Sequence, residues 1–260
     1  MIVALVRCHD AQPLATADGS RLTEWERAAA DAIAHARRRA EWIAGRLVAK
    51  WVLLRDDGPL AWPPSVHRIG REELDAIPAA EYRRIEIGRR DDGAPHVVGA
   101  DTQISIAHRG GWAVAARSDF GFVGVDLEEI ATRRSSFYES NMTVRERRWM
   151  LGAPAAETDR VGTLLWTLKE ACLKTGASAA RTIWEMGAID VEVATPVADV
   201  AANWPSIDVS QGHELAHLPA RIPLAGNHRS TAHAAYGLVD QLVLGVVAEH
   251  TSPSIVGDLS

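Results

Sequence analysis

The sequence predicts a mixed α/β fold arranged as two lobes. The chain has 260 residues with 47% hydrophobic content, which is enough to bury a substantial core in one large domain or in two half-size lobes. Each half of the chain runs through helical patterns and then through short strand-like segments. Because the second series starts near Asp119 to Gly121, we expect an N-terminal lobe over residues 1–120 and a C-terminal lobe over residues 121–260.

The first half opens on a predicted strand over residues 2–6, a short run of apolar and β-branched side chains. Thr23 followed by Glu26 forms a capping box, which indicates a helix start. The helical pattern continues to about Leu54, either as one helix or as two helices joined near residues 35–39. This half therefore pairs one early strand with a long helical stretch.

A further helix is expected over residues 72–84, and the pattern then changes to strands. Asp92-Gly93 is a strong hairpin signal. The strand-like segments, each bounded by turn residues, are 84–89, 95–98, 103–107, 112–116 and 122–127.

In the second half, Thr143 and Glu146 form another capping box, so a helix is expected over residues 143–151. A longer helix is predicted over residues 159–175. Strands are expected over 183–193 and 242–249, and the Pro-, Gly- and His-rich region 196–234 receives no assignment.

Composition excludes several classes of protein. The formal net charge is −6, whereas a nucleic-acid-binding protein usually carries a basic surplus. The two cysteines are too few for a disulfide framework or a four-ligand zinc site. The apolar run at the N-terminus is too short for a signal peptide, and no stretch approaches the roughly 20 apolar residues of a membrane span. We expect a cytoplasmic protein with no nucleic-acid or membrane partner.

The run V-G-V-D-L-E-E over residues 123–129 overlaps the strand predicted over 122–127 and carries two acids, Asp126 and Glu128. Residues two apart on a strand point to the same face, so the two carboxylates project together. A buried pair of carboxylates is costly unless a cation neutralises it, and Mg²⁺ prefers carboxylate oxygens. The alternative is a solvated edge strand with ordinary surface acids.

The predicted helix at 159–175 contains the run W-T-L-K-E-A-C-L-K over residues 166–174. Glu170 and Lys174 lie four apart and share a helix face. Taken alone, the two charges are equally compatible with a surface ion pair worth a few tenths of a kcal/mol.

Together, the two segments resemble the paired signature of the 4′-phosphopantetheinyl transferase superfamily. That signature is a V/I-G-V/I-D strand, a gap of about forty residues, and an F/W-S/C/T-x-K-E-A/S-x-x-K helix. Residues 123–126 fit the first half and residues 166–174 fit the second. Trp166 lies 40 positions after Asp126, so the spacing agrees as well.

Other segments extend the resemblance, with two departures. Residues 103–112 are similar to the family's S-x-S-H segment; His108 matches its histidine, but Ala107 stands where a serine is expected. Residues 86–95 are similar to a strand ending in G-K-P, with Ala94 in place of the lysine.

Residues 44–50 resemble an early arginine-bearing helix that includes Arg46, so the similarity covers residues 40 to 195. The length resembles that of the larger family type, which activates surfactin and other nonribosomal peptide synthetases. This resemblance implies two pseudo-symmetric lobes, each a small antiparallel-rich sheet packed with helices, with the active site in the cleft between them. It also implies a monomer.

The implied activity is transfer of 4′-phosphopantetheine from coenzyme A to a serine of an apo acyl or peptidyl carrier protein, giving the holo carrier and 3′,5′-ADP. This is a holo-[acyl-carrier-protein] synthase reaction. The resemblance implies Mg²⁺, with Mn²⁺ as a substitute, held by Asp126, Glu128 and Glu170. Glu170 is then the base, and Lys174 lies against the pyrophosphate. Lys169 is expected to face outward and hold the helix.

The resemblance further implies that Arg46, Arg89 and His108 receive the 3′-phosphate of coenzyme A. Each has a structural alternative. Arg46 fits a solvated helix face, Arg89 a surface charge at a hairpin end, and His108 a hydrogen-bonded structural histidine.

Two rival functions remain open. His213-Glu214-x-x-His217 matches the zinc-peptidase helix motif, although Gly212 and Pro219 flank it closely and would keep the helix short. A catalytically inactive coenzyme A-binding protein is the second rival, which the departures at positions 94 and 107 allow.

Overall fold

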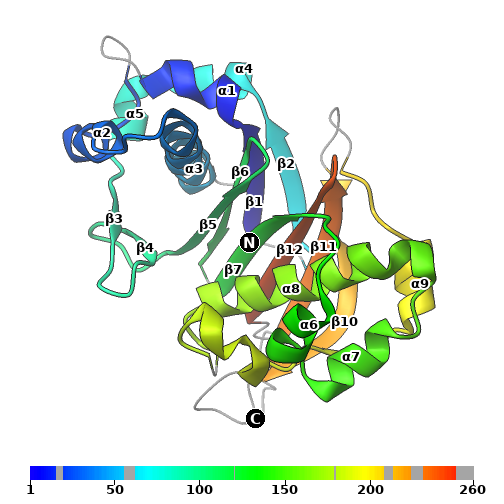
Figure 1. Ribbon diagram of the computed structural model, residues 1–260. Helices are drawn as coiled ribbons and strands as arrows, with labels where there is room; N and C mark the ends of the chain where they lie inside the picture. Colours follow the sequence, from blue (N-terminus) through cyan, green and yellow to red (C-terminus); the bar gives the residue numbers. More distant parts are fainter. Residues whose placement is uncertain are drawn as a thin grey trace, which may run out of the picture.

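The computed structural model describes residues 1–15, 20–55, 62–119, 121–178, 180–207, 213–223 and 231–249. These residues form two β-sheets with helices packed on them (Figure 1). The strands of the first sheet, in spatial order, are β5 (Gln103–Arg109), β6 (Trp112–Ser118), β1 (Ile2–Arg7), β2 (Ser65–Ile69) and β9 (His213–Glu214). Those of the second are β7 (Val123–Glu129), β12 (Leu242–Glu249), β11 (Thr231–Val239), β10 (Ala216–Pro223) and β8 (Glu192–Val193).

The helices are α1 (Cys8–Ala11), α2 (Glu24–Asp31), α3 (Ala36–Leu54), α4 (Arg71–Asp75), α5 (Ala79–Arg83), α6 (Ser135–Asn141), α7 (Val144–Met150), α8 (Thr158–Lys174) and α9 (Val197–Ala202). In the described ranges, 3₁₀ helices cover Gln12–Ala15, Ala155–Glu157 and Ile183–Ala188. A separate hairpin joins β3 (Ile87–Arg89) to β4 (Pro95–Val97). The predicted mixed α/β fold with antiparallel-rich sheets is confirmed.

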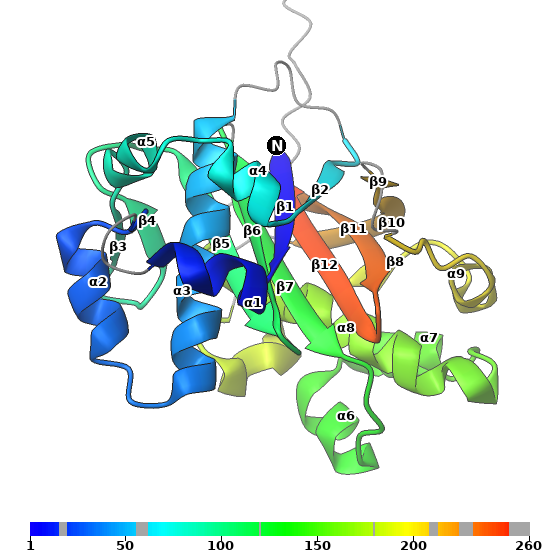
Figure 2. The same cartoon turned by 90° about the horizontal axis from the view of Figure 1, so that it is seen from above.

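The two sheets share a three-strand arrangement. In the first sheet β6 pairs antiparallel with both β1 and β5, and in the second β12 pairs antiparallel with both β7 and β11. Each trio therefore consists of the first strand of its half and two consecutive later strands. A long helix accompanies each trio, α3 in the first half and α8 in the second (Figure 2). The two halves of the chain thus repeat one plan.

The expected division at residue 120 stays a prediction. The boundary between the two three-strand groups does fall near residue 120, since β6 ends at Ser118 and β7 begins at Val123. The short strand β9, however, pairs with β2 of the first sheet although it comes from residues 213–214. The chain therefore returns once from the second half to the first.

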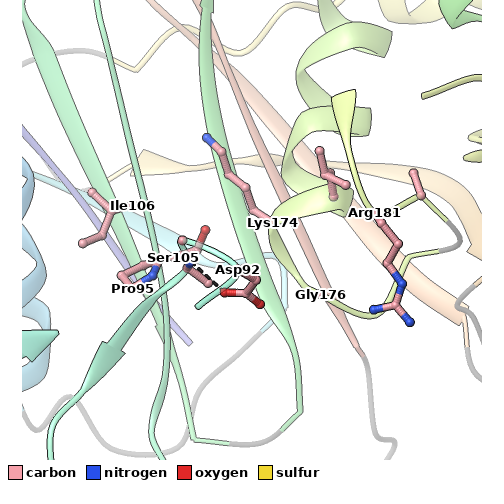
Figure 3. A pocket seen from close by; sticks show the side chains of 11 residues that line it. Asp92, Pro95, Ser105, Ile106, Lys174, Gly176 and Arg181 are labelled. Carbon is pink, nitrogen blue, oxygen red and sulfur yellow. Dashed lines mark hydrogen bonds between the residues drawn. The ribbon is translucent and has the colours of Figure 1, made fainter. Parts of the chain in front are cut away.

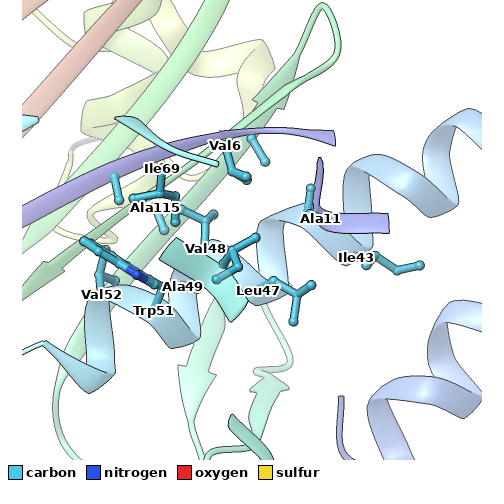
Figure 4. Close-up of a cluster of buried hydrophobic side chains, with 14 of the residues drawn as sticks. Val6, Ala11, Ile43, Leu47, Val48, Ala49, Trp51, Val52, Ile69 and Ala115 are labelled. Carbon is cyan, nitrogen blue, oxygen red and sulfur yellow. The ribbon is translucent and has the colours of Figure 1, made fainter. Parts of the chain in front are cut away.

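The outer face of the first sheet is covered by α3. Val6 and Ala115, from β1 and β6, are fully buried and belong to one hydrophobic cluster with Leu47 and Val48 of α3 (Figure 4). Residues alternate between the two faces of a strand, so every second side chain of β1 enters this cluster. Burial against the sheet orients the helix that carries Arg46.

The inner faces of the two sheets form a second core between the halves. Leu5 and Val114 of the first sheet lie in one buried cluster with Val125 and Leu244 of the second. These residues alternate with the ones that face the helices, as expected for strands buried on both sides. The two halves are therefore joined by apolar packing.

Local signals at helix starts are confirmed. Thr23 and Glu26 form a complete capping box at α2, and Thr143 and Glu146 form one at α7. The long helical stretch of the first half is divided into α2 and α3, with His35 as the N-cap of α3. The sequence left open one helix or two helices joined near residues 35–39, and the structure has two helices, with α3 starting after His35.

Two expected elements are wrong. The helix expected over 72–84 is two short helices, because Pro78 has extended backbone angles (φ −56°, ψ 139°) and lacks an N–H. The strand expected over 183–193 is mostly a 3₁₀ helix, stabilised by local bonds such as Glu185 N–H to Thr182 O at 3.0 Å. Its apolar residues gave no periodicity that distinguishes a strand from a short helix.

No helix among the described residues is both long enough and apolar enough to cross a membrane. Cys8 and Cys172 are buried, and neither forms a disulfide.

Candidate active site

The site is built on the contact between β7 and α8. At Gly124, a Cβ atom would lie 1.8 Å from the backbone oxygen of Ala171, so only glycine permits this approach. Val125 and Leu127 point into the core between the sheets. The intervening residues of β7 therefore face α8 and carry their carboxylates toward it.

Asp126 is the innermost of these acids, with 7% of its side chain exposed. Its Oδ1 accepts a hydrogen bond of 2.6 Å from Nζ of Lys174. Its other oxygen, Oδ2, is buried and has no hydrogen-bond partner among the described residues. A buried carboxylate oxygen without a partner is costly, so this atom is available to a cation or a donor group.

Glu128 lies two residues further along the same face. It is within ion-pair distance of Arg109 at 3.4 Å and of Arg133 at 3.8 Å. Burial raises the pKa of the Glu128 carboxyl, and the negative charge of Asp126 raises it further. The two arginines and Lys174 oppose that rise.

Glu170 projects from α8 toward the same acids. Burial raises the pKa of its carboxyl from 4.5 to about 7, and the charges of Asp126 and Glu128 contribute in the same direction. Lys174 works against them. The three carboxylates therefore lie within electrostatic range of one another.

The acids are compatible with a divalent cation. Within the described ranges, no three His, Cys, Asp or Glu side chains form a ready metal site, and Lys174 is the cation in contact with Asp126. Even so, Oδ2 of Asp126 has no hydrogen-bond partner among the described residues, and the pKa of Glu170 is raised. Carboxylate oxygens of this kind suit Mg²⁺.

A pocket of about 440 Å³ lies beside these acids (Figure 3). One wall comes from the β3–β4 hairpin and β5, and the other from the end of α8 and the segment after it. Its described lining residues are Asp92, Gly93, Ala94, Pro95, Ser105, Ile106, Leu173, Lys174, Gly176, Ala180 and Arg181. The pocket thus lies between the two halves of the chain, and Lys174 is the one candidate site residue among these lining residues.

Arg46 and Arg89 are brought together outside that lining. The guanidinium of Arg46 lies over the ring of Trp42 at 4.6 Å, and its buried Nε has no hydrogen-bond partner among the described residues. Burial lowers the pKa of Arg46 to about 10; Glu26 opposes this effect, and the charge of Arg89 adds to it. Two mutually repelling cations, one of them incompletely paired, form a potential anion site.

His108 lies beside Glu41, with Nδ1 and Oε2 3.4 Å apart. Burial lowers the pKa of the imidazole, Glu41 opposes this, and Lys174 and Arg38 lower it further. His108 is therefore within electrostatic range of Lys174, on the side of the site formed by the first half.

Lys169 does not face outward as expected. It is fully buried, and its Nζ bonds Oε2 of Glu146 at 2.5 Å, while Oε1 of Glu146 accepts the backbone N–H of Val191. Sequence spacing placed Lys169 on α8 but did not reveal that this face of the helix is covered.

The motif His213-Glu214-x-x-His217 does not form a helix. Its first two residues belong to β9, and its last lies in β10. A zinc-peptidase site needs both histidines on one face of a helix, which an extended backbone does not provide.

Three further residues lie near the site, and of these only Ser105, the first serine of the S-x-S-H-like segment, had a signal in the sequence. Ser105 is buried, accepts the N–H of Val125 at 3.0 Å and lines the pocket. Arg133 reaches Glu128 from the loop after β7, and Arg181 lines the pocket from the segment after α8. Arg133 and Arg181 lie outside the regular motifs, so only the folded chain places them here.

Comparison with protein families gives a match to part of the chain. Residues 122–203 match the model of the 4′-phosphopantetheinyl transferase superfamily, a stretch that includes β7, α8 and the three acids. No curated protein matches the chain. The general activity that the match supports is transfer of a phosphopantetheine group. The similarity of this chain to the 4′-phosphopantetheinyl transferase superfamily is therefore shown for residues 122–203.

Proposed function

We propose that this protein transfers the 4′-phosphopantetheine group of coenzyme A to a serine hydroxyl of an apo acyl or peptidyl carrier protein. The observation that carries the proposal is the buried Asp126, which bonds Lys174 at 2.6 Å and lies within electrostatic range of Glu128 and Glu170. Lys174 in turn lines a pocket between the two halves of the chain. Such a site offers acids for a hard cation and a base, together with a cation for phosphate, next to a space that can hold a ligand.

Asp126, Glu128 and Glu170 would hold the Mg²⁺ ion, for which Mn²⁺ would substitute. The unpartnered Oδ2 of Asp126 and the raised pKa of Glu170 support this assignment. When bound, the ion supplies positive charge that stabilises the diphosphate during transfer.

The side chains of the chain then have separate roles. Glu170, in its ionised form, accepts the proton of the carrier serine, whose hydroxyl is otherwise a weak nucleophile. The serine oxygen forms a bond to the phosphorus of the pantetheine phosphate, and the bond to the second phosphate breaks. The departing 3′,5′-ADP takes that electron pair, and the ammonium of Lys174 stabilises the charge.

Arg46, Arg89 and His108 would bind the 3′-phosphate. The unpaired Nε of Arg46 and the mutual repulsion of the two arginines support an anion between them. The wall of the pocket also touches the helix that carries Arg46. Ile106 lines the pocket, and its Cγ2 lies 3.0 Å from where a Cβ of Gly45, the residue before Arg46, would be.

Intact-protein mass spectrometry of apo acyl and peptidyl carrier proteins tests this function. With the enzyme, coenzyme A and Mg²⁺, we expect one carrier to gain the mass of a single phosphopantetheine group. A chelator should abolish the gain, and added Mg²⁺ or Mn²⁺ should restore it. Absence of any gain with several carriers contradicts the proposal.

The same assay separates the rivals. Coenzyme A binding without transfer to any carrier would favour the inactive binding protein. Casein cleavage restored by Zn²⁺ would favour a peptidase.

A further inference from the structure

The pocket has two cationic side chains among its described lining residues, Lys174 and Arg181. Lys174 is already in contact with a carboxylate, at 2.6 Å from Asp126. The guanidinium of Arg181 has no hydrogen-bond or ion-pair partner in the described part of the chain. The two cations therefore differ: one is neutralised by the protein and the other is not.

The backbone of Arg181 is nevertheless fixed. Its N–H donates to Oε2 of Glu185 at 2.6 Å, and the preceding residue, Ala180, is buried and accepts a bond from Oγ of Ser178 at 2.8 Å. Gly176, with φ of +70°, turns the chain away from α8 just before this segment. Anchors on both sides thus hold an exposed arginine at the rim of the pocket.

The described lining residues of the opposite wall include no cation, although the guanidinium of Arg89 lies against Gly93 of that wall, with Nη2 3.0 Å from where a Cβ of Gly93 would be. Pro95, Ser105 and Ile106 lie on one side of the pocket and Arg181 on the other, with Lys174 between them (Figure 3). The carboxylate of Asp92 accepts the backbone N–H of Ala94 at 2.9 Å within its own turn. Among the described lining residues, Arg181 is therefore the cation that an anionic ligand meets without a carboxylate partner.

We propose that Arg181 binds the diphosphate of the donor substrate. This inference rests on the proposed function, in which coenzyme A occupies the pocket. A guanidinium presents parallel N–H donors that match phosphate oxygens. Phosphate binding is more favourable when the guanidinium does not first have to break an ion pair with a carboxylate. Arg181 follows Lys174 by seven residues on the same wall. Arg46 and Arg89 are not among the described lining residues, and the guanidinium of Arg89 lies against Gly93 of the opposite wall. The diphosphate, rather than the 3′-phosphate, is therefore its ligand.

Isothermal titration calorimetry with coenzyme A and with dephospho-coenzyme A, which lacks the 3′-phosphate, tests the assignment. For Arg181→Ala we expect the Kd of both ligands to rise about tenfold, the loss of one charge-assisted contact. Arg181→Lys should restore part of the affinity. Arg221→Ala is the matched control, because Arg221 is an exposed arginine on β10 and does not line this pocket.

The outcomes separate this inference from the function beneath it. If the wild-type protein binds coenzyme A but Arg181→Ala binds both ligands equally well, the role of Arg181 is overturned and the proposed function stands. If only coenzyme A loses affinity, Arg181 binds the 3′-phosphate and the diphosphate assignment is wrong. If the wild-type protein binds neither ligand, the proposed function itself is overturned. Arg181→Ala should keep the wild-type melting temperature, since the residue is exposed and its side chain makes no hydrogen bond or ion pair with the described residues.

Discussion

At the scale of single residues, Glu170 combines burial with like charge. Its raised pKa has two causes, the loss of water around the carboxyl and the nearby charges of Asp126 and Glu128. Each acid of the site is an ordinary residue by sequence. What makes them a potential catalytic group is that the fold removes solvent from all three and leaves Asp126 Oδ2 without a partner.

In the metal-free protein, the same burial makes the ionised carboxylate of Glu170 lower the free energy of unfolding. This effect begins as the pH rises above 4.5, the pKa of the group in the unfolded chain. A carboxyl whose pKa is raised from 4.5 to about 7 holds its proton longer in the folded state, so folding stability falls as pH rises between these values. We predict that Glu170→Gln abolishes phosphopantetheine transfer but stabilises the chelator-treated protein at pH 8, by about 2 kcal/mol. At pH 4.5 the two proteins should have equal stability.

Thermal unfolding at the two pH values measures this effect. Glu129→Gln is the control, because Glu129 is an exposed acid that neighbours Glu128 on β7 but lies on the other face. If Glu170→Gln is no more stable than the wild-type protein at pH 8, ionised Glu170 does not lower the free energy of unfolding, and the prediction is wrong. A fully active variant would exclude Glu170 as both base and ligand.

At the scale of elements, the two halves share a buried ion pair at equivalent places. Glu26 of the first capping box bonds Lys50 of α3 and the N–H of Ile87. Glu146 of the second box bonds Lys169 of α8 and the N–H of Val191 in the same way. In each half, the glutamate at the start of a short helix therefore contacts both a lysine of the long helix and a backbone N–H from a separate segment of the chain. Removing one partner of such a pair leaves an uncompensated buried charge.

The contact between β7 and α8 gives a sharper test at this scale. Gly124→Ala would place a Cβ 1.8 Å from the oxygen of Ala171, so the strand or the helix must move. We predict a loss of about 3 kcal/mol in the free energy of unfolding, together with loss of transfer, because Asp126 and Glu170 would be displaced relative to each other. Denaturant titration and the carrier assay measure the two effects.

Gly187→Ala is the control for that substitution. A Cβ at Gly187 would meet its nearest neighbour, the oxygen of Ser140, at an ordinary distance of 3.4 Å. Equal stability of the two alanine variants would show that β7 and α8 do not approach closely at Gly124.

At the scale of the whole molecule, the apolar core between the sheets joins the halves. Val3 and Leu5 of β1 face Val125 and Leu244 of the second sheet within one buried cluster, and the pocket opens along the same boundary. The position of Arg46 and the hairpin relative to Asp126 and Glu170 therefore depends on packing that neither half provides alone.

We expect this core to make the described part of the chain unfold as one unit. Leu5→Ala, in a fully buried side chain, should cost about 3 kcal/mol. Hydrogen exchange should then speed up in both α3 and α8, whereas Leu151→Ala, at an 86% exposed residue, should change neither helix. Faster exchange confined to α3 would show that the two halves unfold separately.

The sequence by itself determined the features that depend on near neighbours. The capping boxes at Thr23 and Thr143 join groups three residues apart, and the alternation that puts Asp126 and Glu128 on one face follows from strand geometry. The spacing of the two acidic segments was likewise enough to indicate the superfamily that residues 122–203 match.

Only the tertiary structure decided which faces are covered and which distant groups meet. In the folded chain, Lys169 is buried against Glu146, residues 183–188 form a 3₁₀ helix and Arg181 lines the pocket. The physical reason is that burial, ion pairing and pKa depend on atoms far apart in the chain. Local periodicity fixes the direction in which a side chain leaves its element, but the opposing element determines what that side chain meets.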